Sequence, residues 1–170
     1  MMRMMTHLLF VALLGTSVLP RAALAQWRYE YQYDEVRDYQ RQFATLKSAN
    51  QINFGSPYQG GSRMAVVLRR GQFGEMAVLL TVDRGQFACS GECRFSMRFD
   101  DEEASFGLNR AADGSTNVMF VDNDTEFLRM LANTKRLLME ATFSREGNRV
   151  FTFNVQPLRW PPLPDRSKKR

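Results

Sequence analysis

The chain is poor in histidine, the side chain on which much hydrolytic and metal chemistry depends. Histidine occurs once in 170 residues, as His7, and cysteine twice, as Cys89 and Cys93. If His7 leaves with an N-terminal leader, the rest cannot form a Ser-His-Asp triad, a Cys-His pair or a histidine-ligated metal site. Two thiolates without further soft ligands also make a poor zinc site. We therefore expect no metal ion and no cofactor.

The N-terminus has the pattern of a secretory signal peptide. Residues 1–7 carry one arginine and no acid, residues 8–19 form an apolar run, and residues 23–25 offer small side chains for cleavage. The apolar run is shorter than the ~20 residues that a membrane-spanning helix needs. We predict that residues 1–25 are a signal peptide, that no stable membrane insertion occurs, and that the mature protein is periplasmic or secreted.

The positive net charge lies at the two ends of the chain. Of 23 basic side chains, two precede residue 26 and four follow residue 160, which leaves 17; one of the 18 acids follows residue 160, which also leaves 17. A neutral body does not suit a nucleic-acid partner. After Trp160, a proline-rich and basic stretch predicts a disordered tail over residues 161–170 and one domain over residues 26–160.

Alternating apolar and polar side chains dominate the predicted domain, and a period of two indicates strands with one buried face. The alternation is clear over residues 64–68, 76–82, 95–99, 118–120, 137–143 and 151–155, recurs over 27–33, and is less regular over 39–46 and 51–54. Turn residues separate these segments, and no helix intervenes between most of them. We predict an all-β fold, an antiparallel β-sandwich or flattened barrel of about eight to ten strands with one short α-helix.

The predicted helix follows a polar and acidic stretch. Residues 122–126 precede apolar side chains three and four apart that begin at Phe127, which is a helix-start signal. We predict a helix over about residues 124–134. Lys135 and Arg136 are expected to close it at the negative end of its dipole.

Cys89 and Cys93 are separated by three residues. In an oxidising compartment such a pair closes most simply as a small disulfide that pins the bend before Arg94. The alternative is a redox-active pair, but a thioredoxin-type site has two intervening residues at a helix N-terminus, and neither condition is visible here.

Two acidic clusters contain carboxylates that could in principle act in catalysis or bind a cation, but neither has the pattern of a known site of this kind. Residues 100–103 are four contiguous acids after a predicted strand, interpreted as a solvated turn. Residues 122–126 begin like a calcium loop, but Phe127 stands where that loop needs glycine and Asn133 where it needs glutamate. Helix capping explains these acids better, and no glycosidase-like pair is singled out.

Five aromatic residues crowd the start of the predicted domain: Trp27, Tyr29, Tyr31, Tyr33 and Tyr39. An exposed aromatic stripe can stack on sugars, peptides or bases, whereas a buried one packs in the core or at an edge. Nearby acids such as Glu30 and Asp34 repel phosphates, which disfavours nucleic acid. These five residues are the candidate partner-binding residues if their face is exposed.

Four motifs carry a family resemblance: Pro57-Tyr58-Gln59-Gly60-Gly61, Gly85-Gln86-Phe87-x-Cys89, Cys93 with the following Phe99-Asp100, and Phe151-x-Phe153-x-Val155-x-x-Leu158-x-Trp160. Through them the chain resembles an uncharacterised family of small exported proteobacterial proteins. Its centre, helix and last two strands are distantly similar to the invasion-associated locus B family of periplasmic β-sandwich proteins, although that family typically carries additional cysteines. The resemblance implies export and an all-β fold, and implies no catalytic residue.

These observations favour an exported, non-catalytic interaction or envelope-associated protein whose partner is a protein or another envelope component. A periplasmic inhibitor or small-ligand-binding protein is the alternative, and would need an aromatic cavity of roughly 300 Å³ or more. A carboxylate-based hydrolase is a third interpretation, and would need two acids in one cleft with separated pKa values.

Removal of residues 161–170 is expected to leave thermal unfolding unchanged, because a solvated tail adds no buried contacts. Melting of the truncated and full chains, followed by circular dichroism, checks this. A large fall in melting temperature would show that the tail packs on the domain.

Overall fold

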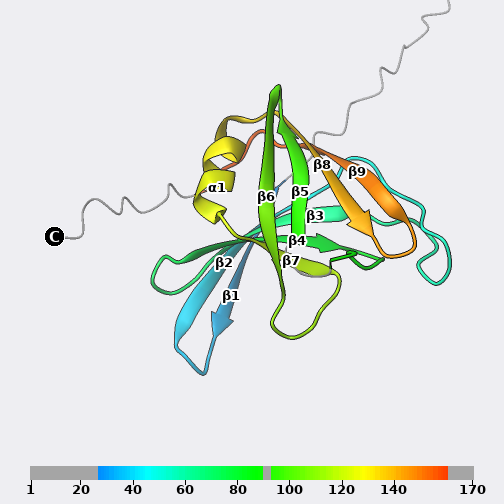
Figure 1. Cartoon of the computed structure of the whole chain (residues 1–170). Helices are drawn as coiled ribbons and strands as arrows, with labels where there is room; N and C mark the ends of the chain where they lie inside the picture. The colour runs from blue at the N-terminus through cyan, green and yellow to red at the C-terminus, as the bar shows by residue number, and fades with distance from the viewer. Residues whose placement is uncertain (1–26, 90–92, 161–170) are drawn as a thin grey trace, which may run out of the picture.

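The computed structural model describes residues 27–89 and 93–160, so the predicted signal peptide and tail lie outside the described residues. Nine strands and one helix follow one another along this part of the chain (Figure 1). They are β1 (Arg28–Asp34), β2 (Tyr39–Lys47), β3 (Met64–Arg70), β4 (Met76–Val82), β5 (Cys93–Phe99), β6 (Glu102–Arg110), β7 (Val118–Val121), α1 (Asp124–Asn133), β8 (Arg136–Phe143) and β9 (Gly147–Asn154).

All strand pairs are antiparallel, which confirms the predicted all-β fold with one short helix. The nine strands form one continuous sheet in the order β1-β2-β3-β4-β7-β6-β5-β8-β9. The sheet does not close, and β1 and β9 are its two edges. It bends over itself, so that β5, β6 and β8 cross in front of β3 and β4 (Figure 1). The two layers of the fold are therefore two halves of a single sheet.

Backbone hydrogen bonds between distant segments hold the bend. The Ala49 N–H donates to the Thr152 carbonyl at 2.7 Å, and the Ser144 N–H donates to the Gln86 carbonyl at 2.9 Å. Phe87 also forms an isolated antiparallel bridge with Phe143. These contacts connect the loops after β2 and β4 to β8 and β9.

The core fills the space between the two halves with apolar side chains. Along β5 the side chains alternate strictly between buried and exposed, as the period of two predicts. Phe99, Phe106 and Phe127 meet edge to face with ring centroids 5.4–6.0 Å apart, and Phe127 brings α1 onto this cluster. The centre of the fold is thus packed by aromatic rings from strands and helix together.

The helix is confirmed, but its end differs from the prediction. Asn123 caps its N-terminus, because its side-chain oxygen accepts a hydrogen bond from the Glu126 N–H at 3.2 Å. No basic residue lies in the last turn. The expectation that Lys135 and Arg136 close the helix was wrong, since Arg136 already begins β8.

Two strand predictions need correction. Residues 51–54 form no strand and contribute only an isolated bridge between Ile52 and Ser62. Residues 100–103 are exposed and residues 100–101 form the expected turn, but the sequence did not predict β6, which begins at Glu102. The acids at the start of β6 precede an alternation of apolar Ala104, Phe106 and Leu108 with small Ser105 and Gly107, which was not recognised as a strand.

Asp100 has a structural role at the turn before β6. Its backbone has a positive φ of 52°, and its carboxylate accepts hydrogen bonds from the N–H groups of Lys135 and Arg136 at 2.8–3.1 Å. These two backbone hydrogen bonds hold the pKa of Asp100 below its ordinary value. The side chain therefore joins the end of β5 to the chain that enters β8.

Phe153 is fully buried in the core. The substitution Phe153→Ala is expected to lower the free energy of unfolding by about 3–5 kcal/mol, because it leaves a cavity as well as removing buried apolar area. Urea denaturation measures the change. Val150→Thr, at an exposed position on the same strand, is the control and is expected to change stability by less than about 0.5 kcal/mol.

The substitution Asp100→Asn is expected to lower the melting temperature at neutral pH, because the amide carries no charge for the two N–H donors. A carboxyl group whose pKa is depressed in the folded state stabilises the fold above its unfolded pKa and loses this effect as pH falls. The difference between wild type and variant should therefore shrink below about pH 4. Melting curves from pH 7 to pH 2.5 test this, and a constant difference would contradict the assigned role.

Candidate partner-binding surface on the first hairpin

The candidate site lies on the hairpin formed by β1 and β2, which projects from the body of the fold at the lower left of Figure 1. The two strands pair along the whole of β1, from Arg28 opposite Thr45 to Asp34 opposite Tyr39. β2 also pairs with β3, but only from Gln42 onward. The outer half of the hairpin therefore extends beyond the rest of the sheet.

Three tyrosines lie on one face of this hairpin. Tyr29 stands opposite Ala44 and Tyr31 opposite Gln42, and residues directly opposite in an antiparallel pair point to the same side. Ala44 and Leu46 are fully buried, so this is the face that forms the core further along the sheet. Tyr29, Tyr31 and Tyr33 are nevertheless 37, 65 and 60% exposed. We call Tyr29, Tyr31 and Tyr33 the tyrosine face.

The other two aromatic candidates do not belong to this face. Trp27 is buried, and its indole N–H donates to the Val155 carbonyl at 2.6 Å. Tyr39 stands opposite Asp34, on the other side of the hairpin, and is half-buried. Its hydroxyl accepts a hydrogen bond from Arg41 Nε at 2.6 Å, and the Arg41 guanidinium lies 5.2 Å from its ring centroid. Trp27 therefore anchors the hairpin to the body of the fold, and Tyr39 packs against Arg41 on the other side of the hairpin.

The three exposed tyrosines differ in their hydrogen bonds. The Tyr29 hydroxyl accepts from the Arg159 N–H at 2.7 Å. The Tyr33 hydroxyl donates to the Asp38 carboxylate, and this bond raises the pKa of Tyr33. Among the described residues, Tyr31 has no hydrogen-bond partner for its hydroxyl. The most exposed ring of the face thus also has a free polar end.

Ion pairs tie the tip of the hairpin. The Asp34 carboxylate accepts hydrogen bonds from the backbone N–H and guanidinium of Arg37, and from Arg41 at 2.8 Å. Partial desolvation acts to raise the pKa of Asp34, but the hydrogen bonds and charges of Arg37 and Arg41 outweigh it and lower that pKa. Ion pairs and hydrogen bonds within the hairpin itself therefore hold its tip.

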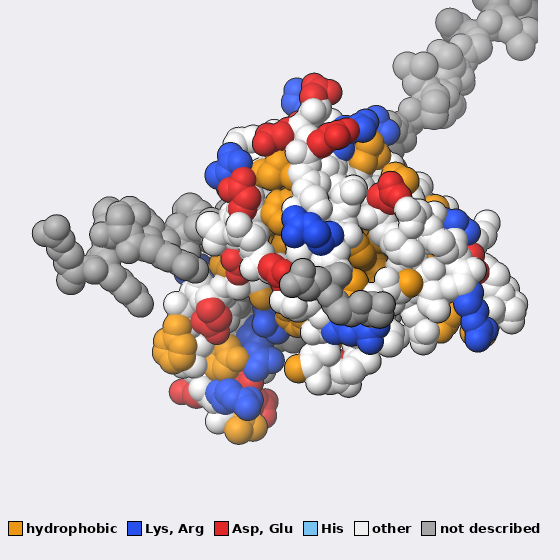
Figure 2. Space-filling model, viewed as in Figure 1, with side chains coloured by type: hydrophobic (Ala, Val, Ile, Leu, Met, Phe, Trp, Pro, Cys, Tyr) orange, Lys and Arg blue, Asp and Glu red, His pale blue; other side chains and the backbone are white. Residues whose placement is uncertain are grey.

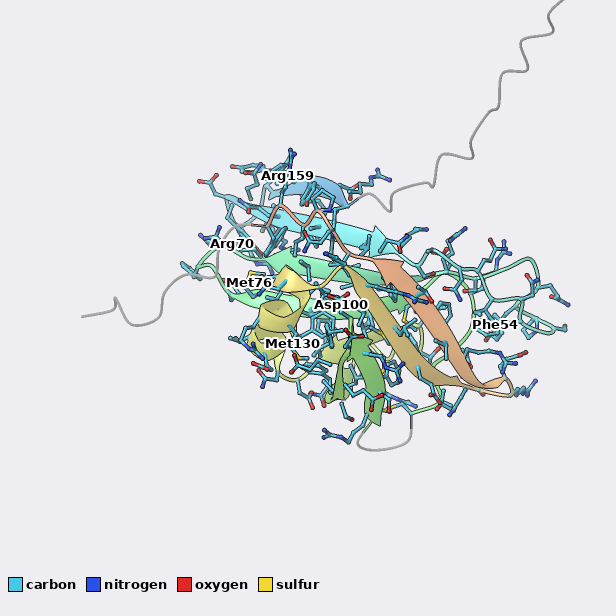
Figure 3. The ribbon with its side chains drawn as sticks, turned by 90° about the horizontal axis from the view of Figure 1, so that it is seen from above. Phe54, Arg70, Met76, Asp100, Met130 and Arg159 are labelled. Atoms are coloured by element: carbon cyan, nitrogen blue, oxygen red, sulfur yellow. A yellow bond between two sulfur atoms is a disulfide. The ribbon has the colours of Figure 1, made fainter. Side chains whose placement is uncertain are left out.

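A groove opens beside the tyrosine face, at the point where the C-terminal segment reaches the hairpin. It has a volume of about 360 Å³ and is lined by Tyr29, Tyr31, Gln42, Phe43, Arg159 and Trp160. Arg159 lies beside β1 in Figure 3. Sequence reasoning missed Phe43, Arg159 and Trp160 as part of this surface, because they come from the partner strand and from a segment about 130 residues away.

Further apolar side chains are exposed at this end of the sheet. Val36 at the hairpin tip is 91% exposed, and Phe73 in the turn between β3 and β4 is 88% exposed. That turn is near the hairpin because Gln42 stands opposite Arg70 at the end of β3. Figure 2 shows hydrophobic patches at the lower left, interleaved with basic and acidic side chains. The exposed apolar surface therefore extends beyond the three tyrosines.

A separate group of acidic residues lies near the start of the helix. Glu102, Asp122 and Glu126 line a groove of about 380 Å³ between β6 and the start of α1. Glu126 is paired with Arg129 at 2.6 Å, and the hydrogen bond from Arg129 lowers the pKa of Glu126. Asp122 accepts a hydrogen bond from the Asn109 side chain. Glu126 and Asp122 are therefore held by local partners.

The cysteine prediction is confirmed. Cys89 and Cys93 form a disulfide with their Cα atoms 5.6 Å apart, and both are buried. Cys93 is the first residue of β5, so the bond fixes the entry to that strand. The pair lies in the core and does not contribute to the tyrosine face.

The described residues contain neither a candidate metal cluster nor a candidate membrane-spanning helix. Within residues 27–89 and 93–160, no three His, Cys, Asp or Glu side chains come together as a group that could hold a metal ion. The same residues contain no helix with the length and apolarity that crossing a membrane requires.

Comparisons with known proteins give one distant structural neighbour. No protein-family model matches the chain, and no curated protein matches its sequence. Among solved structures, the crystal structure of invasion associated protein B from Bartonella henselae is similar, with 15% sequence identity and a TM-score of 0.43. The match covers 75% of this chain and 84% of that chain. Identity and TM-score this low do not assign the chain to a family or to a function.

Proposed function

We propose that this chain is an exported, non-catalytic binding protein that contacts a protein or another envelope component through its tyrosine face. The observation that carries the proposal is the position of Tyr31 and Tyr33. They lie on the face that forms the core elsewhere in the sheet, yet more than half of each side chain is exposed. Contiguous exposed apolar surface of this kind marks interaction sites on soluble proteins.

Tyrosine suits a contact surface for a physical reason. Its ring buries a large area while only two side-chain torsions are ordered, and its hydroxyl can hydrogen-bond at the rim. On this hairpin the ring positions are set by the strand, and the tip is tied by Asp34, Arg37 and Arg41. A partner would meet a surface that is already ordered, which lowers the entropic cost of binding.

Export is supported by the disulfide. Cys89 and Cys93 are the two cysteines of the chain, and they are paired. Structural disulfides form and persist mainly in oxidising compartments such as the bacterial periplasm. The proposal places the protein there or outside the cell.

The described carboxyl groups single out no acid for a carboxylate-based hydrolase, and the proposed function assigns no catalytic residue. A carboxylate-based hydrolase needs one carboxyl group that stays protonated near neutral pH. Wherever a described carboxyl group has a clearly shifted pKa, the shift is downward: Asp34, Asp100, Asp113 and Glu126. Each of these acids accepts hydrogen bonds that stabilise its charged form.

A small-ligand-binding protein is the second candidate, and the aromatic groove favours it. Tyr29, Tyr31 and Trp160 line a space of about 360 Å³, which is within the size range of ligand pockets. The groove lies at the surface beside the hairpin, whereas the centre of the fold is filled by fully buried phenylalanines. We therefore place this candidate second.

The test removes the exposed rings without touching the core. The double variant Tyr31→Ser with Tyr33→Ser is expected to reduce capture of the partner from envelope extracts by about tenfold or more. Tyrosines that become buried at an interface are frequent hot spots, each contributing about 2 kcal/mol to binding. Capture is quantified by mass spectrometry against wild type. The matched control is Val150→Ser, at an exposed position on β9.

Two outcomes would contradict the proposal: a partner retained equally by the double variant, or no partner recovered by the wild type above the background of beads alone. Thermal melting of both variants shows that the fold is kept. If the bound molecule is instead small, Trp160 fluorescence will change when a low-molecular-weight envelope fraction is added, and no protein will be captured.

A further inference from the structure

The two edges of the sheet are not equivalent. The edge of β9 is covered by the segment after β2. The Thr152 carbonyl accepts a hydrogen bond from the Ala49 N–H, and the Thr152 N–H donates to the Asn50 side-chain oxygen. The Asn50 side-chain amide in turn donates to the Val150 carbonyl. β1 pairs with β2 on one side, and no described strand pairs with its other side. A seven-residue edge whose outward backbone groups have no partner strand among the described residues is a template for another strand.

The sequence of β1 complements itself when it is read in the opposite direction. Pairing centred on Tyr31 places Tyr31 opposite Tyr31 of a second copy and Tyr29 opposite Tyr33. On the other face, Arg28 stands opposite Asp34 and Glu30 opposite Gln32. Opposite charges and aromatic rings are both favourable as direct cross-strand pairs.

Neighbouring registers lack this match. The two copies of β1 can shift relative to each other only in steps that move the two-fold axis from one residue to the next. Other shifts would put side chains on opposite faces or leave the outward backbone groups without partners. A shift centred on Glu30 places Glu30 opposite its own copy, and a shift centred on Gln32 places Glu30 opposite Asp34. Both shifts bring like charges together, so charge selects the register centred on Tyr31.

We propose that β1 pairs antiparallel with β1 of a second copy of this chain across a two-fold axis at Tyr31. The axis is perpendicular to the sheet, so the tyrosine faces of both copies lie on the same side and form one larger surface. The pairing uses the backbone edge of β1 and leaves that surface open. This inference therefore stands or falls independently of the proposed function.

The charged groups of the hairpin can accommodate the second copy. The Arg28 side chain is 80% exposed and has an ion pair only with Glu30, two residues along the same strand. The Asp34 carboxylate already accepts three hydrogen bonds, from Arg37 and Arg41. A carboxylate offers about four acceptor positions, so one remains for Arg28 of the other copy.

A cysteine on the two-fold axis tests the register. Residues directly opposite in an antiparallel pair have Cα atoms about 4.5–5.5 Å apart, which a disulfide can bridge. Tyr31→Cys is therefore expected to give a covalent dimer on non-reducing gels after mild oxidation of the full chain. Tyr33→Cys is the matched control, because position 33 lies about 13 Å from its own copy in this register.

The exposed Gln32 provides a second test that does not depend on disulfide formation. In the proposed register it stands opposite Glu30 twice per dimer. Gln32→Lys is expected to lower the dimer dissociation constant and Gln32→Glu to raise it, each by up to about tenfold. Sedimentation equilibrium measures both, with circular dichroism as the control for folding.

Three results would overturn the dimer: a chain that stays monomeric at about 100 µM, equal dimerisation of both Gln32 variants, or crosslinking through position 33 without crosslinking through position 31. The second and third results would mean that two copies meet through another surface or register. None of them would alter the capture experiment, which depends on the exposed tyrosine rings.

Discussion

A single sheet that buries one face against itself is the constraint on which the rest of the structure depends. Because β1 to β4 and β5 to β9 belong to one sheet, the bend packs the apolar face of each half against the apolar face of the other. The strands supply side chains with a period of two, and the bend brings those side chains together. The helix then covers the phenylalanines at one end of this space through Phe127.

The same constraint explains why the hairpin is exposed. β2 begins three residues before the first residue that pairs with β3, and Tyr31 and Tyr33 on the inner face of this outer part are mostly exposed. Side chains that would be core residues further along the sheet therefore face solvent. Their exposure follows from the length of the hairpin relative to the body of the sheet.

The sequence predicts most of the strands because alternation is a local property. It predicts the helix start from the polar residues before Phe127, and the disulfide from spacing and compartment. It misses β6, because Glu102 and Glu103 are polar on both faces at the solvent end of that strand. It also misassigns Lys135 and Arg136, whose N–H groups bind Asp100, a contact between residues about 35 positions apart.

The candidate site also depends on contacts between residues that are far apart in the sequence. The stripe of tyrosines is visible in the sequence, but the sequence does not show which face of β1 looks toward the core, or that Trp27 is anchored by the Val155 carbonyl. Isolated two-stranded hairpins are marginally stable in water. This one is held at its base by Trp27 and at its tip by Asp34 with Arg37 and Arg41. Residues at both ends thus stabilise a hairpin whose middle exposes Tyr31. The fold itself therefore sets the position of the Tyr31 side chain, and a partner could contact it without a rearrangement of the hairpin.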